Sequence, residues 1–139
     1  MSKPNKLSAY FSIKGIFDPA AITSRLGMLP SDCWAKGDLN PLNQIERKFS
    51  RWRLGSRLDH SRALEEHIRD VISQLQPNVE SVREISKEFN GVLEVVGYFY
   101  SDDPGPILNS DEVAEIAALG LSMDFDYYYL HSARPEDTE

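Results

Sequence analysis

The sequence is poor in the residues from which metal sites, disulfides and thiol chemistry are built. Its single cysteine, Cys33, excludes an internal disulfide and any C-x-x-C zinc or redox motif. The three histidines, His60, His67 and His131, form neither an H-x-x-x-H nor an H-E-x-x-H arrangement. Glycine-rich phosphate loops and the G-x-S-x-G nucleophile motif are also absent. We therefore expect no metal and no cofactor, and an enzyme is the weaker class of function.

Long hydrophobic runs are missing as well. None approaches the roughly 20 residues that a membrane-spanning helix needs. The first six residues include two lysines, but the segment after them alternates apolar with polar residues, unlike the core of a signal peptide. The expectation is a soluble, cytoplasmic protein in which Cys33 is a buried, unreactive thiol.

Basic residues are outnumbered. Lys and Arg total 15 against 22 Asp and Glu, which gives a net charge of −7. The isoelectric point is about 4.9. Nucleic acid is not expected as a partner, because neutralising backbone phosphates requires a broad basic surface. The acidity suits a basic protein partner instead.

One stretch departs from this balance. Residues 47–62, called the basic segment below, carry six Lys or Arg and one Asp, so the segment is net +5 while the rest of the chain sums to −12. Charge of one sign acts over a Debye length of about 8 to 10 Å, which favours a surface facing an anion or a partner. The candidate partner- or anion-binding residues are Arg47, Arg51, Arg53 and Arg57. The alternative is that these arginines pair with surplus acids on a solvated surface.

Alternation within the basic segment predicts a strand over residues 50–55. Trp52 and Leu54 fall on its buried face, with Trp52 as a core anchor. Arg51 and Arg53 then project to the solvent side, about 7 Å apart. Replacing both by Glu is expected to leave folding almost unchanged, because exposed substitutions change stability by only about 0.5 kcal/mol.

Apolar periodicity predicts the other elements. Period-2 patterns indicate strands over 7–13 and 121–129, a mostly apolar run indicates a central strand over 92–100, and a short strand is possible at 33–36. Helical spacing indicates four helices, over about 19–26, 64–75, 79–89 and 110–119. The expected caps are Asp18 for the first helix, Asp59 or Ser61 for the second, Asn90-Gly91 at the end of the third, and Asn109 or Ser110 for the fourth.

These elements predict a single α+β domain over residues 1–131. We expect a sandwich in which helices cover a mixed or mostly antiparallel sheet, with two possible strand-helix-strand halves. Residues 132–139 form an acidic tail with almost no apolar side chains and are predicted to be disordered.

Several caps, turns and core positions together resemble a bacterial family. They are Phe17-Asp18-Pro19, Ile22, Leu26-Gly27, Pro30, Lys36-Gly37-Asp38, Trp52, residues 64–68, residues 116–121, Asp124 and Tyr127. From about Leu7 to about Tyr129 the chain resembles the domain of unknown function family 4279. The resemblance implies a small stand-alone bacterial domain of unassigned activity, and it supplies no catalytic or binding residue.

Two functions remain open at this point. The first is a non-catalytic protein-interaction module, for instance an immunity-type partner of a larger protein. The alternative is a small enzyme or ligand-binding domain whose cleft is lined by Arg51, Arg53 and the carboxylates of Asp102, Asp124 and Asp126. A convex charged surface favours the first, and a deep pocket on which these groups converge favours the second.

Overall fold

Strand β1 (Lys6–Gly15) forms the middle of a five-stranded mixed sheet in the computed structural model, which describes residues 3–130. The other elements are α1 (Pro19–Leu26), β2 (Asp32–Trp34), β3 (Ser50–Gly55), α2 (Leu64–Leu75), a 3-10 turn (Gln76–Asn78), α3 (Val79–Phe89), β4 (Val92–Phe99), α4 (Ser110–Ala118) and β5 (Ser122–Tyr129). The described residues form one α+β domain, as predicted. The proposed boundary at residue 131 and the tail at 132–139 lie outside them.

The strand order is β2-β3-β1-β4-β5. β1 pairs antiparallel with β3 and with β4, β2 pairs antiparallel with β3, and β5 runs parallel to β4. Both ends of the chain therefore contain a strand-helix-strand unit with parallel strands. In the second unit, β4 and β5 are neighbours, whereas β3 lies between β1 and β2 in the first.

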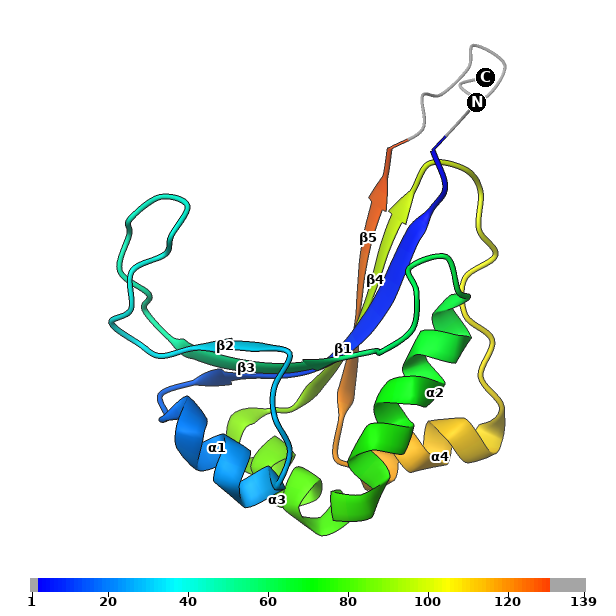
Figure 1. Ribbon diagram of the computed structural model, residues 1–139. Helices are drawn as coiled ribbons and strands as arrows, with labels where there is room; N and C mark the ends of the chain where they lie inside the picture. The colour runs from blue at the N-terminus through cyan, green and yellow to red at the C-terminus, as the bar shows by residue number, and fades with distance from the viewer. Residues whose placement is uncertain (1–2, 131–139) are drawn as a thin grey trace.

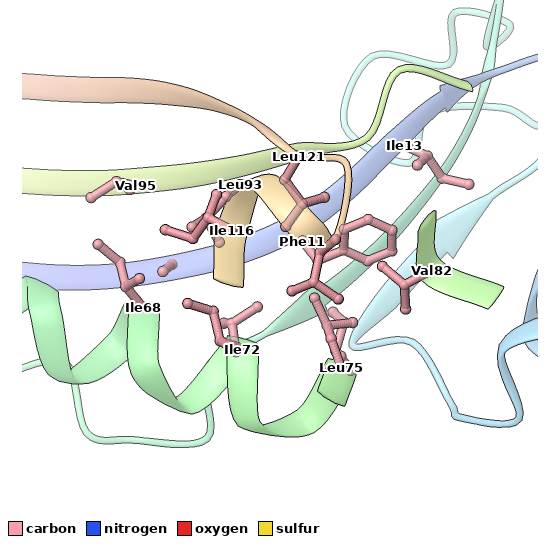
Figure 2. Packing of buried hydrophobic residues seen from close by; sticks show 14 of the residues in the cluster. Phe11, Ile13, Ile68, Ile72, Leu75, Val82, Leu93, Val95, Ile116 and Leu121 are labelled. Atoms are coloured by element: carbon pink, nitrogen blue, oxygen red, sulfur yellow. The ribbon is translucent and has the colours of Figure 1, made fainter. Parts of the chain in front are cut away.

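All four helices cover the same face of the sheet (Figure 1). Helix α2 packs along β1 and buries an apolar stripe that includes Ile68, Ile72 and Leu75. Figure 2 shows this stripe beneath sheet residues such as Phe11 and Leu93. Within residues 3–130 no helix lies on the opposite face, so the side chains of that face are open to solvent or to a partner. None of the helices within residues 3–130 is long and apolar enough to cross a membrane.

Local signals explain most helix ends. The Asp18 side chain accepts the N–H of Ala20 at the start of α1, and α1 ends at Gly27, whose φ is 67°. Asn109 caps α4, and Asn90 ends α3 in the left-handed conformation with φ 54°.

The predicted cap of α2 was wrong. The helix starts after Ala63, whose N–H donates to the Glu66 carboxylate at 2.9 Å. Asp59 instead accepts the N–H of Ser61 at 2.9 Å and builds the turn before the helix. Glu66 thus forms the half of a capping box in which the carboxylate at the third helical position accepts the backbone N–H of the N-cap residue, a contact that requires no polar side chain at the N-cap itself.

Two further predictions need correction. Cys33 is exposed, not buried, because it lies on the short edge strand β2. His67, expected at the margin of the apolar stripe, has no exposed surface, and its Nδ1 lies 2.7 Å from Ser56 Oγ.

Candidate functional site

The face of the sheet that no helix covers is lined by charged and polar side chains, and we call it the open face. Strand register identifies its members, because paired residues point to the same side of a sheet. They are Asp32 and Trp34 from β2; Arg51 and Arg53 from β3; Lys6, Ser8, Tyr10, Ser12 and Lys14 from β1; Glu94, Val96 and Tyr98 from β4; and Asp124, Asp126 and Tyr128 from β5.

An ion-pair network occupies the centre of the open face. Arg51 reaches from β3 across β1, where its Nε donates to Ser12 Oγ at 3.3 Å, and its Nη2 donates to Glu94 Oε1 on β4 at 2.6 Å. Arg53 lies 3.9 Å from the other oxygen of Glu94 and 3.7 Å from Asp32 Oδ2. The network therefore connects strands β2, β3 and β4 across β1.

Aromatic rings contact the guanidinium groups of two arginines, Arg53 and Arg47. The Arg53 guanidinium lies 3.9 Å from the centroid of the Tyr10 ring, and that of Arg47 lies 3.8 Å from the centroid of Trp34. Gly55 is the cross-strand neighbour of Tyr10, and a Cβ at Gly55 would come within 2.8 Å of the ring. The absence of a side chain at Gly55 thus leaves room for the Tyr10 ring over the sheet, where the ring contacts the Arg53 guanidinium.

Two hollows follow the network. One, of about 410 Å³, is lined by Arg51, Arg53, Glu94 and Asp126, with Tyr10 and Tyr98 among its walls. The other, of about 470 Å³, shares Arg51, Glu94 and Asp126 and adds Lys14 and Asp124. Both are open depressions of the sheet surface, the first lined mainly by polar atoms and the second by polar and apolar atoms in about equal measure, so this face has neither a deep apolar pocket nor a simply convex shape.

The structure brings together most, but not all, of the residues predicted for a site. Arg51 and Arg53 share one hollow, and Arg47 and Arg51 line a further depression of about 300 Å³ next to them. Arg57 lies apart from this group and forms a 2.7 Å ion pair with Asp70 of α2. That contact raises the pKa of Arg57. Asp102 lies on the β4–α4 connection and lines neither hollow.

The basic segment is largely neutralised in the folded protein. Four of its arginines form ion pairs with carboxylates: Arg51, Arg53, Arg57 and Arg62. Arg47 and Lys48 are the basic residues of the segment that form no ion pair within residues 3–130. Arg51 and Arg53 thus lie on the predicted face, but they are partly buried and paired, and the expectation that reversing them is harmless to folding no longer follows.

The connection between β2 and β3 is a structural feature in its own right, and we call residues 35–49 the hairpin. It projects from the sheet away from the helices (Figure 1). Its base is closed by backbone bonds between Gly37 and Arg47 at 2.9 Å and between Arg47 and Asp38 at 2.7 Å. Ser50 anchors that base, because its Oγ accepts the N–H of Lys36 and donates to the carbonyl of Phe17.

The tip of the hairpin presents apolar side chains to solvent. Leu42 is 93% exposed, and Leu39 and Ile45 are 59% and 61% exposed. Side chains of Asn40 and Asn43 accept the N–H groups of Leu42 and Ile45, both at 2.9 Å, and so hold the tip in a defined conformation. A loop that is ordered by its own polar groups and leaves its large apolar residues uncovered is typical of an interaction site.

Most charges of the open face that form no ion pair within residues 3–130 are segregated. Lys14 lies opposite Arg51 in the register, and Arg47 and Lys48 border them at the hairpin end. Glu94 lies opposite Asp124 in the parallel pair of β4 and β5, with Asp126 two residues further along. Among residues 3–130 no cluster of three or more His, Cys, Asp or Glu is arranged to hold a metal ion. The face can therefore bind charged groups of either sign at its two ends.

Sequence reasoning missed Glu94, Tyr10 and the hairpin apolar residues. Glu94 is the only acidic residue in the apolar run 92–99, and that isolation was an available signal for a buried ion pair. Leu39, Leu42 and Ile45 gave no periodic signal, because the hairpin is not a regular element.

Fold and site together define a small α+β domain with one helix-covered sheet face and one open, charged face. Residues 5–130 match the family described as a domain of unknown function (DUF4279), and the chain belongs to that family. No curated protein and no solved structure matches the chain.

Proposed function

We propose that this protein is a non-catalytic protein-interaction module whose docking surface is the hairpin and the adjoining basic half of the open face. The observation that carries the proposal is the solvent exposure of Leu39, Leu42 and Ile45 on a hairpin that is otherwise fixed by hydrogen bonds. Removing exposed apolar side chains of this kind from water lowers the free energy, and on this hairpin a partner has to cover them.

The chemistry around the hairpin specifies the partner. Phe49 is half exposed, and the Lys14 ammonium lies 5.3 Å from the centroid of its ring. Arg47 and Lys48 line the depression of about 300 Å³ to which Phe49 and Lys14 also belong, and they form no ion pair within the described residues. The partner that fits is a protein with an apolar patch rimmed by carboxylates, because the rim charges then pair with these cations.

The role we infer is inhibition or escort of a larger protein in a bacterial cytoplasm, which includes the immunity-type role. The exposed thiol of Cys33 is consistent with a reducing compartment. Ion pairs with Glu94 hold Arg51 and Arg53 in place at the centre of the face, beside the surface on which a partner can dock.

Capture experiments test the proposal. The tagged protein is used to retain partners from its native cell, and the isolated partner is then titrated against wild type and the Leu42→Ser/Ile45→Ser variant. We expect the variant to bind about tenfold or more weakly, since exposed apolar anchors each contribute about 1 kcal/mol or more. Binding to the wild type should also weaken with salt.

The matched control is Ile107→Ser/Val113→Ser, which removes two similarly exposed apolar residues near α4. It should bind as wild type does. Equal binding by the hairpin variant and wild type would reject the hairpin as the docking surface.

A ligand-binding or enzymatic role is the second candidate, favoured by the convergence of Arg51, Arg53 and Asp126 on the 410 Å³ hollow. The hollow suits a small zwitterion or polar anion. Glu94 already pairs with Arg51 at 2.6 Å and with Arg53 at 3.9 Å, so a ligand has to compete with existing ion pairs. Stabilisation of the protein against heat by a small charged metabolite, lost in Tyr10→Ala, is the result that would favour this candidate.

A further inference from the structure

We propose that strand β5 is a second docking site, which takes an extended segment of a partner protein as an additional strand with alternating basic and apolar residues. The inference rests on the proposed function, because it names the form of a protein partner. It concerns the edge of the sheet formed by β5, which lies at the other end of the strand order from β2 and the hairpin.

The position of β5 supplies the first argument. It is an edge strand of eight residues that pairs with β4 on one side, and no other strand of residues 3–130 lies on its outer side. The edge is also long compared with the three residues of β2 at the other end of the sheet. Free edges of this length are templates for strand addition.

The two faces of β5 offer different chemistry. Phe125, Tyr127 and Tyr129 alternate on the helix side, and Phe125 and Tyr129 are 49% and 69% exposed. Their rings contact Tyr127 at 5.8 and 6.4 Å between centroids, which makes one aromatic ridge. Such a ridge can cover the apolar side chains of an added strand.

The other face is acidic. Asp124 and Asp126 lie on the open face, and neither forms an ion pair with a cation among residues 3–130. Tyr128 donates its hydroxyl to Asp126 at 3.2 Å. Basic residues at alternate positions of an added strand meet these two carboxylates, while its apolar residues face the aromatic ridge.

The same carboxylates argue against a second copy of this chain as the occupant. In an antiparallel β5–β5 pair centred near Phe125, Asp124 of one copy lies opposite Asp126 of the other. Like charges directly opposite each other destabilise a strand pair. The charge pattern therefore selects a basic partner segment.

The test uses blocked, fluorescent ten-residue peptides and the full chain. The probe alternates Lys and Val, one control alternates Glu and Val, and a second control is the probe with N-methylated amides at every other residue. We expect the wild type to bind only the Lys/Val probe, with an affinity that falls with salt and with slower amide exchange in β5.

Variants separate charge from fold. Asp124→Asn/Asp126→Asn should weaken the probe about tenfold or more, whereas Glu80→Gln/Glu84→Gln on α3 removes the same charge elsewhere and should bind as wild type does. Asp124→Lys/Asp126→Lys should exchange the preference and bind the Glu/Val peptide.

Several results would overturn the inference: no binding of the probe to wild type, undiminished binding to the Asn variant, or equal binding of the N-methylated peptide. Concentration-dependent dimers with protected β5 amides would identify a second copy as the occupant. The hairpin variant Leu42→Ser/Ile45→Ser should bind the probe normally, so failure of the edge site and failure of the hairpin site are read separately.

Discussion

Arg51 and Glu94 form the shortest ion pair of the open face. Their 2.6 Å ion pair crosses β1, and the side chains are only 27% and 12% exposed. A partly buried carboxylate that loses its partner keeps its desolvation cost, so such pairs are more sensitive to truncation than surface pairs.

Arg51→Ala should therefore lower the free energy of unfolding by about 1 to 3 kcal/mol. The control is Arg25→Ala, which breaks the exposed Arg25–Glu88 pair of 3.0 Å and should cost less than about 1 kcal/mol. Urea unfolding measures both. Equal losses would mean that the network on the open face is no stronger than ordinary surface charge.

His67 is the second informative residue, because it is a titratable group inside the core. Burial lowers its pKa from the usual 6.5, and the nearby His60 lowers it further, against smaller opposing effects of the Arg62 backbone, Asp70 and Glu66. The imidazole is therefore neutral in the folded protein near pH 7, with Nδ1 beside Ser56 Oγ.

The pH dependence follows from this shift. Below pH 6.5 the unfolded chain protonates His67 more readily than the folded protein does, so stability falls as the pH drops below about 6.5. His67→Gln, which does not titrate, should show a flatter profile in that window. Urea unfolding at pH 7.5, 6.5 and 5.5 compares the two, and parallel profiles would exclude His67 as the cause.

Among the elements, α2 contributes most to the core. It buries Leu64, His67, Ile68, Val71, Ile72 and Leu75 against the sheet and α4. The sequence predicts this helix well, because its apolar residues recur at helical spacing over three turns.

Ile68→Ala should cost about 2 to 5 kcal/mol in unfolding free energy, since the side chain is fully buried and leaves a cavity. Glu84→Ala, on the exposed side of α3, is the control and should change stability by less than about 0.5 kcal/mol. A loss below half a kilocalorie for Ile68→Ala would contradict the packing of α2.

Elements with a regular period were the predictable ones. β1, β3, β5 and all four helices follow from alternation or helical spacing, and Asp18, Asn90 and Asn109 mark their ends as expected. The start of α2 could not be predicted in the same way, because Glu66 supplies the capping contact from inside the helix. Exposure of Cys33 also escaped prediction, since it depends on β2 being an edge strand.

At the scale of the whole molecule, the site was predictable only in part. The alternation around Trp52 gave the face of Arg51 and Arg53, but not their partner Glu94, which lies 41 to 43 residues away in sequence. The strand order that brings β4 next to β1 determines this contact, and no local pattern encodes that order. The same order places Lys14, Arg47 and Lys48 near the hairpin and the carboxylates of Asp124 and Asp126 on β5.

The central claim is that a partner covers the hairpin. Hydrogen–deuterium exchange of the protein, alone and in complex with the captured partner, tests it most directly. We predict slower exchange of amides in residues 38–49 on complex formation, and unchanged exchange in α1 and α3 on the far side of the sheet. Protection confined to those helices, with the hairpin exchanging as in the free protein, would contradict the account.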